Sequence, residues 1–137
     1  MVPIDGSPAS LEAVALASDI AKKNKGTVYV VHVIEVKRTL PLDAQLSPEA
    51  NAGEELLAEA EKVGREHKVE IEGEILQARE AGHAIIDEAL ERDIDLIVVG
   101  TEQAEDDGGY QLGRVVPYLL STAPCGVWVW RHSSRNP

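Results

Sequence analysis

Apolar residues recur along this chain with two periods that alternate from one segment to the next. Segments 27–33 and 95–99 are almost continuously apolar and rich in β-branched residues, as expected of strands covered on both faces. Between such segments, apolar residues return every three or four positions, which predicts helices that each bury one stripe. The predicted strands are 1–4, 27–33, 69–76, 95–99 and 126–130, and the predicted helices are 8–25, 47–67, 80–92 and 113–122.

Turn residues and charge patterns refine these elements. Ser7 is predicted to be the N-cap of the first helix and Pro8 its first residue, while Gly26 follows lysines near the end of the helix and ends it. Acidic and apolar residues alternate over 69–76, so one face or edge of that strand is expected to lie in water. The helix over 80–92 is expected to face inward with Ile85, Ile86, Ala89 and Leu90.

The alternation of strands and helices predicts an α/β fold with a doubly wound, five-stranded parallel sheet of the Rossmann-like kind. Crossovers of more than about a dozen residues require parallel pairing, and right-handed connections place helices on both faces. A chain of 137 residues fits one domain over 1–137, with a polar tail at 132–137. Such sheets bind ligands where the strand order reverses, which directs attention to the loops after Ile4 and Val99.

The charge balance narrows the possible partners. The chain carries 13 basic and 24 acidic residues, a formal net charge of -11 at pH 7. This charge repels phosphates and anionic membrane surfaces, so nucleic acid is not expected as a partner. No apolar run approaches the roughly 20 residues that span a bilayer, and the first residues lack a signal-peptide pattern. We therefore expect a cytoplasmic protein without membrane insertion.

The sequence contains no recognisable catalytic or metal-binding constellation. Ser7 and Ser121 lack the context of a nucleophile elbow, and neither can be paired by sequence with a histidine and an acid. His32 and His83 are isolated, as core or surface histidines usually are. Cys125, the single cysteine, can form no internal disulfide and is expected to be an unreactive core residue. The chain is predicted to be no enzyme and to hold no metal.

Four segments carry a more specific pattern. They are Val2-Pro3-Ile4-Asp5-Gly6-Ser7, Val31-His32-Val33, Asp95-Leu96-Ile97-Val98-Val99-Gly100 and Ala123-Pro124-Cys125-Gly126-Val127. Taken in order, they resemble the universal stress protein family over essentially the whole chain. The resemblance implies the strand order 3-2-1-4-5 of an adenine nucleotide alpha hydrolase-like fold. It also implies that a nucleotide, in the members that bind ATP, lies between the first and fourth strands.

The ATP-binding members share a signature of Gly, two residues, Gly, nine residues, then Gly-Ser or Gly-Thr. Gly100 and Gly113 occupy the first and last glycine positions with the family's spacing. Gln103 stands at the second glycine position, and Arg114 stands where the small hydroxyl residue would be. The signature is therefore degenerate at two positions.

Both departures weaken the site for phosphates. Glycines let backbone N–H groups approach a phosphate closely, and a hydroxyl at the helix start adds a donor near the positive end of the helix dipole. Arg114 can partly compensate as a cation. The loop nevertheless carries four carboxylates whose charge opposes a triphosphate: Glu102, Glu105, Asp106 and Asp107. We expect no tightly bound cofactor, and ATP or AMP only at low affinity.

The adenosine half of the site matches the family better. The resemblance assigns Asp5 and Val33 to the base and ribose region. Asp5 has an alternative role of equal weight, because its carboxylate can cap the turn into the first helix. The candidate ligand-binding residues are Pro3, Ile4, Asp5, Val33, Val99, Gly100, Gly113, Arg114 and Val115.

The last predicted strand is unusually rich in large apolar residues. Trp128 and Trp130 share one face of it, and Val127 and Val129 share the other. Either the tryptophans are buried beneath a helix or this strand pairs with its counterpart across a twofold axis, as the resemblance implies. We expect a homodimer through Val127, Trp128, Val129 and Trp130.

Three functional hypotheses follow. The first is a regulatory module of the universal stress protein type that acts through dimerisation and contact with protein partners, with weak or absent ATP binding. The second is an ATP or AMP sensor in which Arg114 replaces the missing phosphate ligands. The third is a cytoplasmic regulatory domain of a membrane transporter, because domains of this family also occur fused to transporters.

Overall fold

The computed structural model describes residues 1–102 and 113–133. Strands and helices alternate along these residues as the periodicity predicts. The elements are β1 (Val2–Pro3), α1 (Pro8–Asn24), β2 (Val28–Glu35), α2 (Ser47–Glu66), β3 (Ile71–Ala78), α3 (Ala81–Glu91), β4 (Leu96–Glu102), α4 (Val115–Thr122) and β5 (Gly126–His132). β4 continues past the apolar run to Glu102, which brings that carboxylate into the sheet.

The described strands pair in parallel. β2 lies between β1 and β3, and β4 pairs with β5. Met1 connects these two groups, because its carbonyl oxygen accepts a hydrogen bond from Val98 N at 3.0 Å and its amino group donates to the Leu96 carbonyl oxygen at 2.8 Å. The predicted order 3-2-1-4-5 is thus shown in part: the pairing within each group is shown, and Met1 is the link between β1 and β4.

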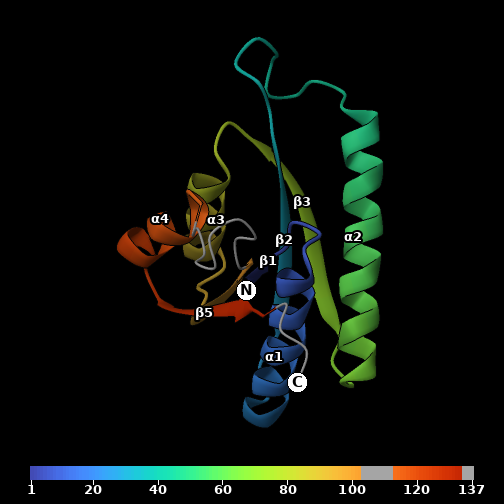
Figure 1. Cartoon of the computed structure of the whole chain (residues 1–137), viewed down its shortest axis with the longest axis vertical. Helices are drawn as coiled ribbons and strands as arrows, with labels where there is room; N and C mark the ends of the chain where they lie inside the picture. Colours follow the sequence, from blue (N-terminus) through green and yellow to red (C-terminus); the bar gives the residue numbers. More distant parts are fainter. Residues whose placement is uncertain (103–112, 134–137) are drawn as a thin grey trace.

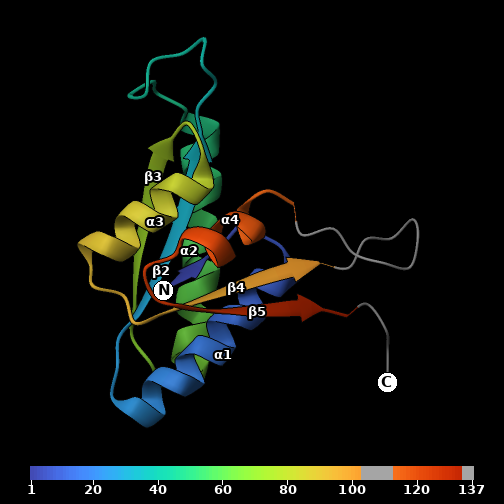
Figure 2. The same ribbon diagram turned by 90° about the vertical axis from the view of Figure 1, so that its left-hand side faces the viewer.

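Helices cover both faces of the strands. α1 and α2 lie on one face and α3 and α4 on the other, as Figure 1 shows, and Figure 2 looks onto the face that carries α3 and α4. This arrangement confirms the predicted doubly wound α/β fold.

The sheet divides the core into two clusters. One cluster lies toward α1 and α2 and includes Val14, Val30 and Val98. The other lies toward α3 and α4 and includes Ile97 and Val99 from the same strand β4. Those three residues of β4 are at most 4% exposed. Because successive side chains of a strand point to opposite faces, a strand buried on both faces needs no polar alternation.

The start of α1 follows the predicted signals, whereas Gly26 does not form the C-cap at its end. Ser7 is the N-cap, its hydroxyl accepts a hydrogen bond from Ser10 N at 3.2 Å, and a proline opens the helix as predicted. At the other end, Lys25 and not Gly26 adopts the left-handed conformation, with φ 55°. The N–H of Gly26 instead donates to the Ala21 carbonyl oxygen at 2.8 Å.

One predicted core residue is wrong. Leu90 is 60% exposed, whereas Ile85 and Ala89 are at most 2% exposed. The buried stripe of α3 is centred on Ile85 and Ala89, so Leu90 lies at its border in the last turn of the helix.

α2 is the longest helix, with 20 residues, and it packs against the sheet through a narrow stripe. Its buried residues are Gly53, Leu57, Ala60 and Gly64. Small residues on this stripe let the helix approach the strands closely: a Cβ added to Gly64 would lie 2.5 Å from the Ile71 side chain. Across the described residues, no helix has both the length and the apolar character that crossing a membrane requires.

β5 forms an apolar edge in the described part of the chain. It pairs with β4, and Trp128, Val129 and Trp130 are 51%, 39% and 44% exposed. The Trp130 indole donates to Glu12 Oε1 on α1 at 2.6 Å, so this ring lies against the helix without being buried by it. Burial of both tryptophans within the subunit is therefore excluded, and the edge is left with large exposed apolar side chains.

Cys125 offers a test of the packing just before β5. The thiol is partly buried, and this burial raises its pKa above the ordinary value. Because the thiolate is the reactive form, we expect alkylation by iodoacetamide at pH 7.5 to be slower in the folded protein than in urea, where the pKa is normal. Mass spectrometry of timed samples measures both rates. Equal rates in the two states would contradict this account of the site.

Candidate functional site

A pocket of about 360 Å³ opens where the strands end and the helices begin. Its walls come from the carboxyl ends of β1, β2 and β4 and from the first residues of α1, α3 and α4. This is the place where the chain order of the strands reverses, between β1 and β4. Open α/β sheets bind their ligands at this kind of position.

All nine candidate residues line this one pocket. They are Pro3, Ile4, Asp5, Val33, Val99, Gly100, Gly113, Arg114 and Val115. They come from four separate segments of the chain, and the fold brings them together. Their role in binding a ligand stays a prediction. Gln103, Glu105, Asp106 and Asp107 lie outside the described residues.

The turn between β1 and α1 forms one wall. Gly6 has φ 89°, a conformation that L residues with a side chain rarely adopt. Asp5 Oδ1 accepts a hydrogen bond from Ser7 N at 2.9 Å, which confirms its role as the cap of this turn. That bond engages one carboxylate oxygen and holds Asp5 at the rim of the pocket, where it is exposed.

His32 is a pocket residue that sequence reasoning assigned to the core or the surface. Its Nδ1 lies 2.8 Å from the carbonyl oxygen of Ile4. A carbonyl oxygen only accepts, so Nδ1 carries the proton in this contact. The bond ties the end of β1 to β2 directly beneath Asp5. The signals in the sequence were a polar residue near the end of an apolar strand and its place in the segment Val31-His32-Val33.

Gly100 has a packing role that the phosphate signature did not suggest. A Cβ added to it would lie 2.4 Å from the carbonyl oxygen of Ala9 and 2.8 Å from Ser10 N. These are backbone atoms of the first turn of α1, which cannot move cheaply. Glycine is required here because α1 lies directly on the end of β4, as in other α/β sheets that need close packing of a helix on a strand.

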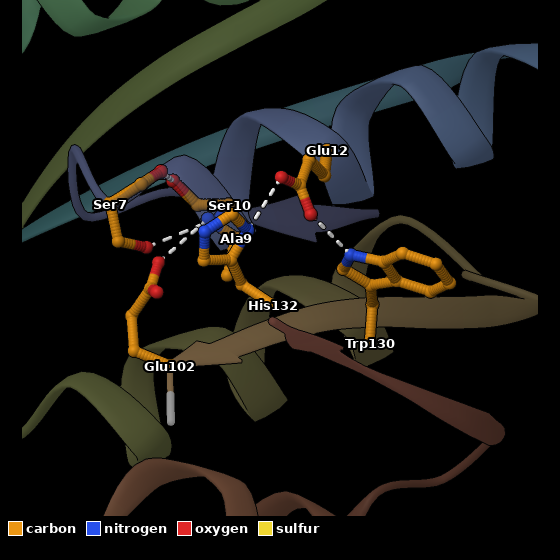
Figure 3. A network of polar contacts seen from close by, with 7 residues as sticks. All are labelled: Ser7, Ala9, Ser10, Glu12, Glu102, Trp130 and His132. Carbon is orange, nitrogen blue, oxygen red and sulfur yellow. Dashed lines mark hydrogen bonds and ion pairs between the residues drawn. The ribbon is translucent and has the colours of Figure 1, made fainter. Parts of the chain in front are cut away.

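Glu102 places a carboxylate at the same contact. Its Oε1 accepts a hydrogen bond from Ala9 N at 2.8 Å, and Glu102 also lines the pocket. Figure 3 shows Glu102 reaching from β4 to the first turn of α1 beside Ser7. The first N–H groups of a helix have no partner within it and carry a partial positive charge. Glu102 therefore occupies the anion-attracting end of α1 from inside the pocket.

α4 begins at the opposite wall without such a cap. Gly113 has φ 65° and turns the chain into Arg114, the N-cap residue, whose side chain makes no capping hydrogen bond. The Arg114 side chain is 90% exposed, and its guanidinium lies 4.0 Å from Glu35 Oε1. Arginine has no acceptor atom, so it cannot replace the hydroxyl that would cap this helix.

A second hollow of about 500 Å³ adjoins the pocket and shares four lining residues with it. Glu35 lines this hollow, and its Oε2 accepts a hydrogen bond from Ala81 N at the start of α3 at 2.9 Å. The helix starts of both α1 and α3 are thus occupied by carboxylates of the protein itself.

Sequence reasoning missed half of the pocket wall. The further lining residues are Ser7, Ser10, Val31, His32, Ala81, Ile85, Thr101, Glu102 and Val116. Glu102 was noted as part of an acidic loop, but its place on β4 and its contact with α1 were not foreseen. Across residues 1–102 and 113–133, no group of three or more His, Cys, Asp and Glu side chains is arranged to hold a metal ion.

The strands, helices and pocket together define a Rossmann-like α/β protein with a crevice at its switch point. Comparison with known proteins makes this more specific. The profile of the universal stress protein family matches residues 1–131. The chain is 33% identical over 142 residues to universal stress protein MJ0531 of Methanocaldococcus jannaschii, with 99% of this chain and 83% of that protein covered. The chain belongs to the universal stress protein family.

Solved structures agree with this assignment. A universal stress protein from Archaeoglobus fulgidus has a TM-score of 0.79 at 24% identity, with 93% of each chain covered. A universal stress protein from the same organism in complex with dAMP has a TM-score of 0.74 at 22% identity, covering 93% of this chain and 92% of that one. A third, in complex with cAMP, has a TM-score of 0.78 at 22% identity, covering 96% and 95%. These likenesses establish the fold.

The contact between Gly100 and α1 predicts a specific instability. Gly100→Ala should lower the free energy of unfolding by about 1–3 kcal/mol, because the added Cβ meets backbone atoms of Ala9 and Ser10. Urea denaturation followed by far-UV circular dichroism measures this change.

Gly126→Ala is the matched control for that substitution. A Cβ there would make an ordinary contact of 3.5 Å with the Leu96 side chain, and Gly126 lies on a strand. We expect this variant to remain within about 0.5 kcal/mol of the unmodified protein. A Gly100→Ala variant as stable as Gly126→Ala would argue against the close packing of α1 on β4.

Proposed function

We propose that this protein is a non-catalytic regulatory module of the cytoplasm that binds adenosine-type ligands in the pocket between β1 and β4 and acts as a homodimer. The observation that carries the proposal is the convergence of all nine candidate residues on one pocket at the switch point. Ligand occupancy would be transmitted to protein partners through the surface around the pocket.

The adenosine half of the pocket is the better equipped half. Ile4, Val31 and Val33 supply apolar surface for a flat base, and Asp5 supplies a carboxylate that can accept hydrogen bonds from ribose hydroxyls. Similar structures in complex with dAMP and cAMP support an adenine-containing ligand.

In the described residues, two of the groups that could bind phosphates are turned to solvent or already bound within the protein. Arg114, the N-cap residue of α4, has a side chain that is 90% exposed, and the start of α1 is already bound by Glu102. Hydrogen-bond donors that are satisfied within the protein add little to the binding of a ligand. We therefore propose that phosphates contribute little to affinity.

The dimer would form along β5. Its exposed edge carries Trp128, Val129 and Trp130. Unpaired edge strands of this kind associate unless they are short, charged or covered. Pairing with a second copy would bury these side chains and extend the sheet across a twofold axis.

A second candidate function rests on the place of Arg114. Because Arg114 lines the pocket and its long side chain is exposed, it can swing toward a polyphosphate and pair with it as a cation. In that case the protein is an ATP or AMP sensor.

Calorimetry with adenosine and ATP separates these functions. We expect adenosine to bind and ATP to bind no more than about threefold more tightly, since the phosphates find few donors. Asp5→Ala should weaken adenosine binding by about tenfold or more, the usual effect of losing a hydrogen bond to a charged group. Asp43→Ala removes an exposed carboxylate outside the pocket and serves as the control.

A rescue variant tests the reason for weak phosphate binding. Gln103→Gly with Arg114→Ser restores both signature positions and should raise ATP affinity by about tenfold while leaving adenosine unchanged. Micromolar ATP binding to the unmodified protein that Arg114→Ser abolishes would favour the sensor. A lack of adenosine binding altogether would contradict both functions.

The proposed dimer predicts a twofold mass in solution. Val129→Lys places a charge on the edge strand and should convert the protein to a monomer at micromolar concentration, as light scattering or sedimentation would measure. Leu120→Lys is the control, since Leu120 is also exposed, at 54%, but lies on α4 and not on the edge strand. An unmodified protein that is already monomeric would rule out this interface.

A further inference from the structure

We propose that the pocket selects adenosine derivatives whose 5′ substituent is uncharged or cationic, and that Glu102 sets this preference. The inference rests on the proposed function and concerns the ligand class of the same site. The sequence predicts a site that binds ATP or AMP weakly. We propose instead a site that binds adenosine derivatives with a neutral or positive 5′ group more tightly than those with a negative one.

The place of Glu102 defines which part of the ligand it faces. With the base and ribose placed on Ile4, Asp5 and Val33 as proposed above, the rest of the described pocket wall includes 99–102 and 113–116. The proposal places the 5′ position of the ligand toward this part of the wall. Glu102 belongs to it and is held there by the hydrogen bond of 2.8 Å from Ala9 N.

This hydrogen bond keeps the Glu102 carboxylate in place when an anionic ligand enters the pocket. Glu102 caps the first turn of α1, and moving it aside would leave the Ala9 N–H without its partner at the edge of the core. A phosphate could take over this N–H, but only by displacing a tethered carboxylate whose charge also repels it. The pocket thus carries its own anion at the position that attracts anions.

The other described side chains near the pocket do not cancel the charge of Glu102. Asp5 adds a second carboxylate to the lining. Arg114 is the cationic side chain among the lining residues, and it is 90% exposed and within 4.0 Å of Glu35 Oε1. A charge that is largely in solvent and close to a counter-ion contributes little inside the pocket. An amine or sulfonium group at the 5′ position would instead meet the Glu102 carboxylate.

The experiment is a charge series at the 5′ position. Titration calorimetry at low ionic strength and pH 7 compares 5′-amino-5′-deoxyadenosine, adenosine and AMP, which carry a positive, a neutral and a negative group. We expect the amine to bind about tenfold more tightly than adenosine and AMP about tenfold more weakly, the size of one charge–charge contact at a protein surface. Added salt should narrow this range.

Glu102→Gln tests the assignment to this residue. Glutamine keeps an oxygen that accepts the Ala9 N–H, so the fold should be retained, which an unchanged thermal midpoint would verify. The affinity ratio of the amine to AMP should fall by about tenfold or more, with adenosine unchanged. Glu91→Gln removes the same charge at the far end of α3 and should leave the ratio as it was.

The outcomes separate this inference from the proposed function. Adenosine binding with AMP bound equally or more tightly overturns the inference and leaves the adenosine site in place. A charge preference that persists in Glu102→Gln overturns the role of Glu102. Failure of all three compounds to bind overturns the proposed function itself, and this inference with it.

Discussion

The seating of the first turn of α1 on the end of β4 is the contact on which the rest of the structure depends. Gly100 permits it, because a side chain there would run into the backbone of Ala9. Glu102 stabilises this contact, because its carboxylate accepts a hydrogen bond from the Ala9 N–H. This contact forms part of one wall of the pocket. It holds the start of α1, which follows directly after the turn that carries Asp5. The packing requirement and the chemistry of the site are therefore met by the same residues.

The same helix connects the pocket to the apolar edge of the molecule. Glu12, one turn after Ala9 on α1, accepts hydrogen bonds from the Trp130 indole and from His132 Nδ1, both at 2.6 Å (Figure 3). His132 is the register partner of Glu102 across β4 and β5. The start of α1 thus holds the ends of both strands. Glu102 at the pocket is therefore connected to β5 in two ways. It is the register partner of His132, and it binds Ala9 on α1, one turn before Glu12, which binds His132.

Two of the helix starts at the crevice are occupied by carboxylates of the protein itself. Helix starts in α/β sheets usually attract anionic ligands because their first N–H groups lack partners. Here Glu102 and Glu35 satisfy those groups at α1 and α3. Burial of apolar surface by the two clusters keeps the architecture intact, so the chemistry of the crevice can change without any change of fold.

The sequence by itself determined the elements, their parallel pairing and the place of the pocket that the candidate residues line. Apolar periodicity is a local property, and the residues after Ile4 and Val99 sit at strand ends whatever the details of packing. Tertiary structure alone decided that Gly100 serves helix packing, that His32 and Glu102 face the pocket, and that Leu90 and both tryptophans stay exposed. Each of these depends on the distance between elements remote in the chain, such as the 93 residues between Ala9 and Glu102. No pattern along the sequence encodes such a distance.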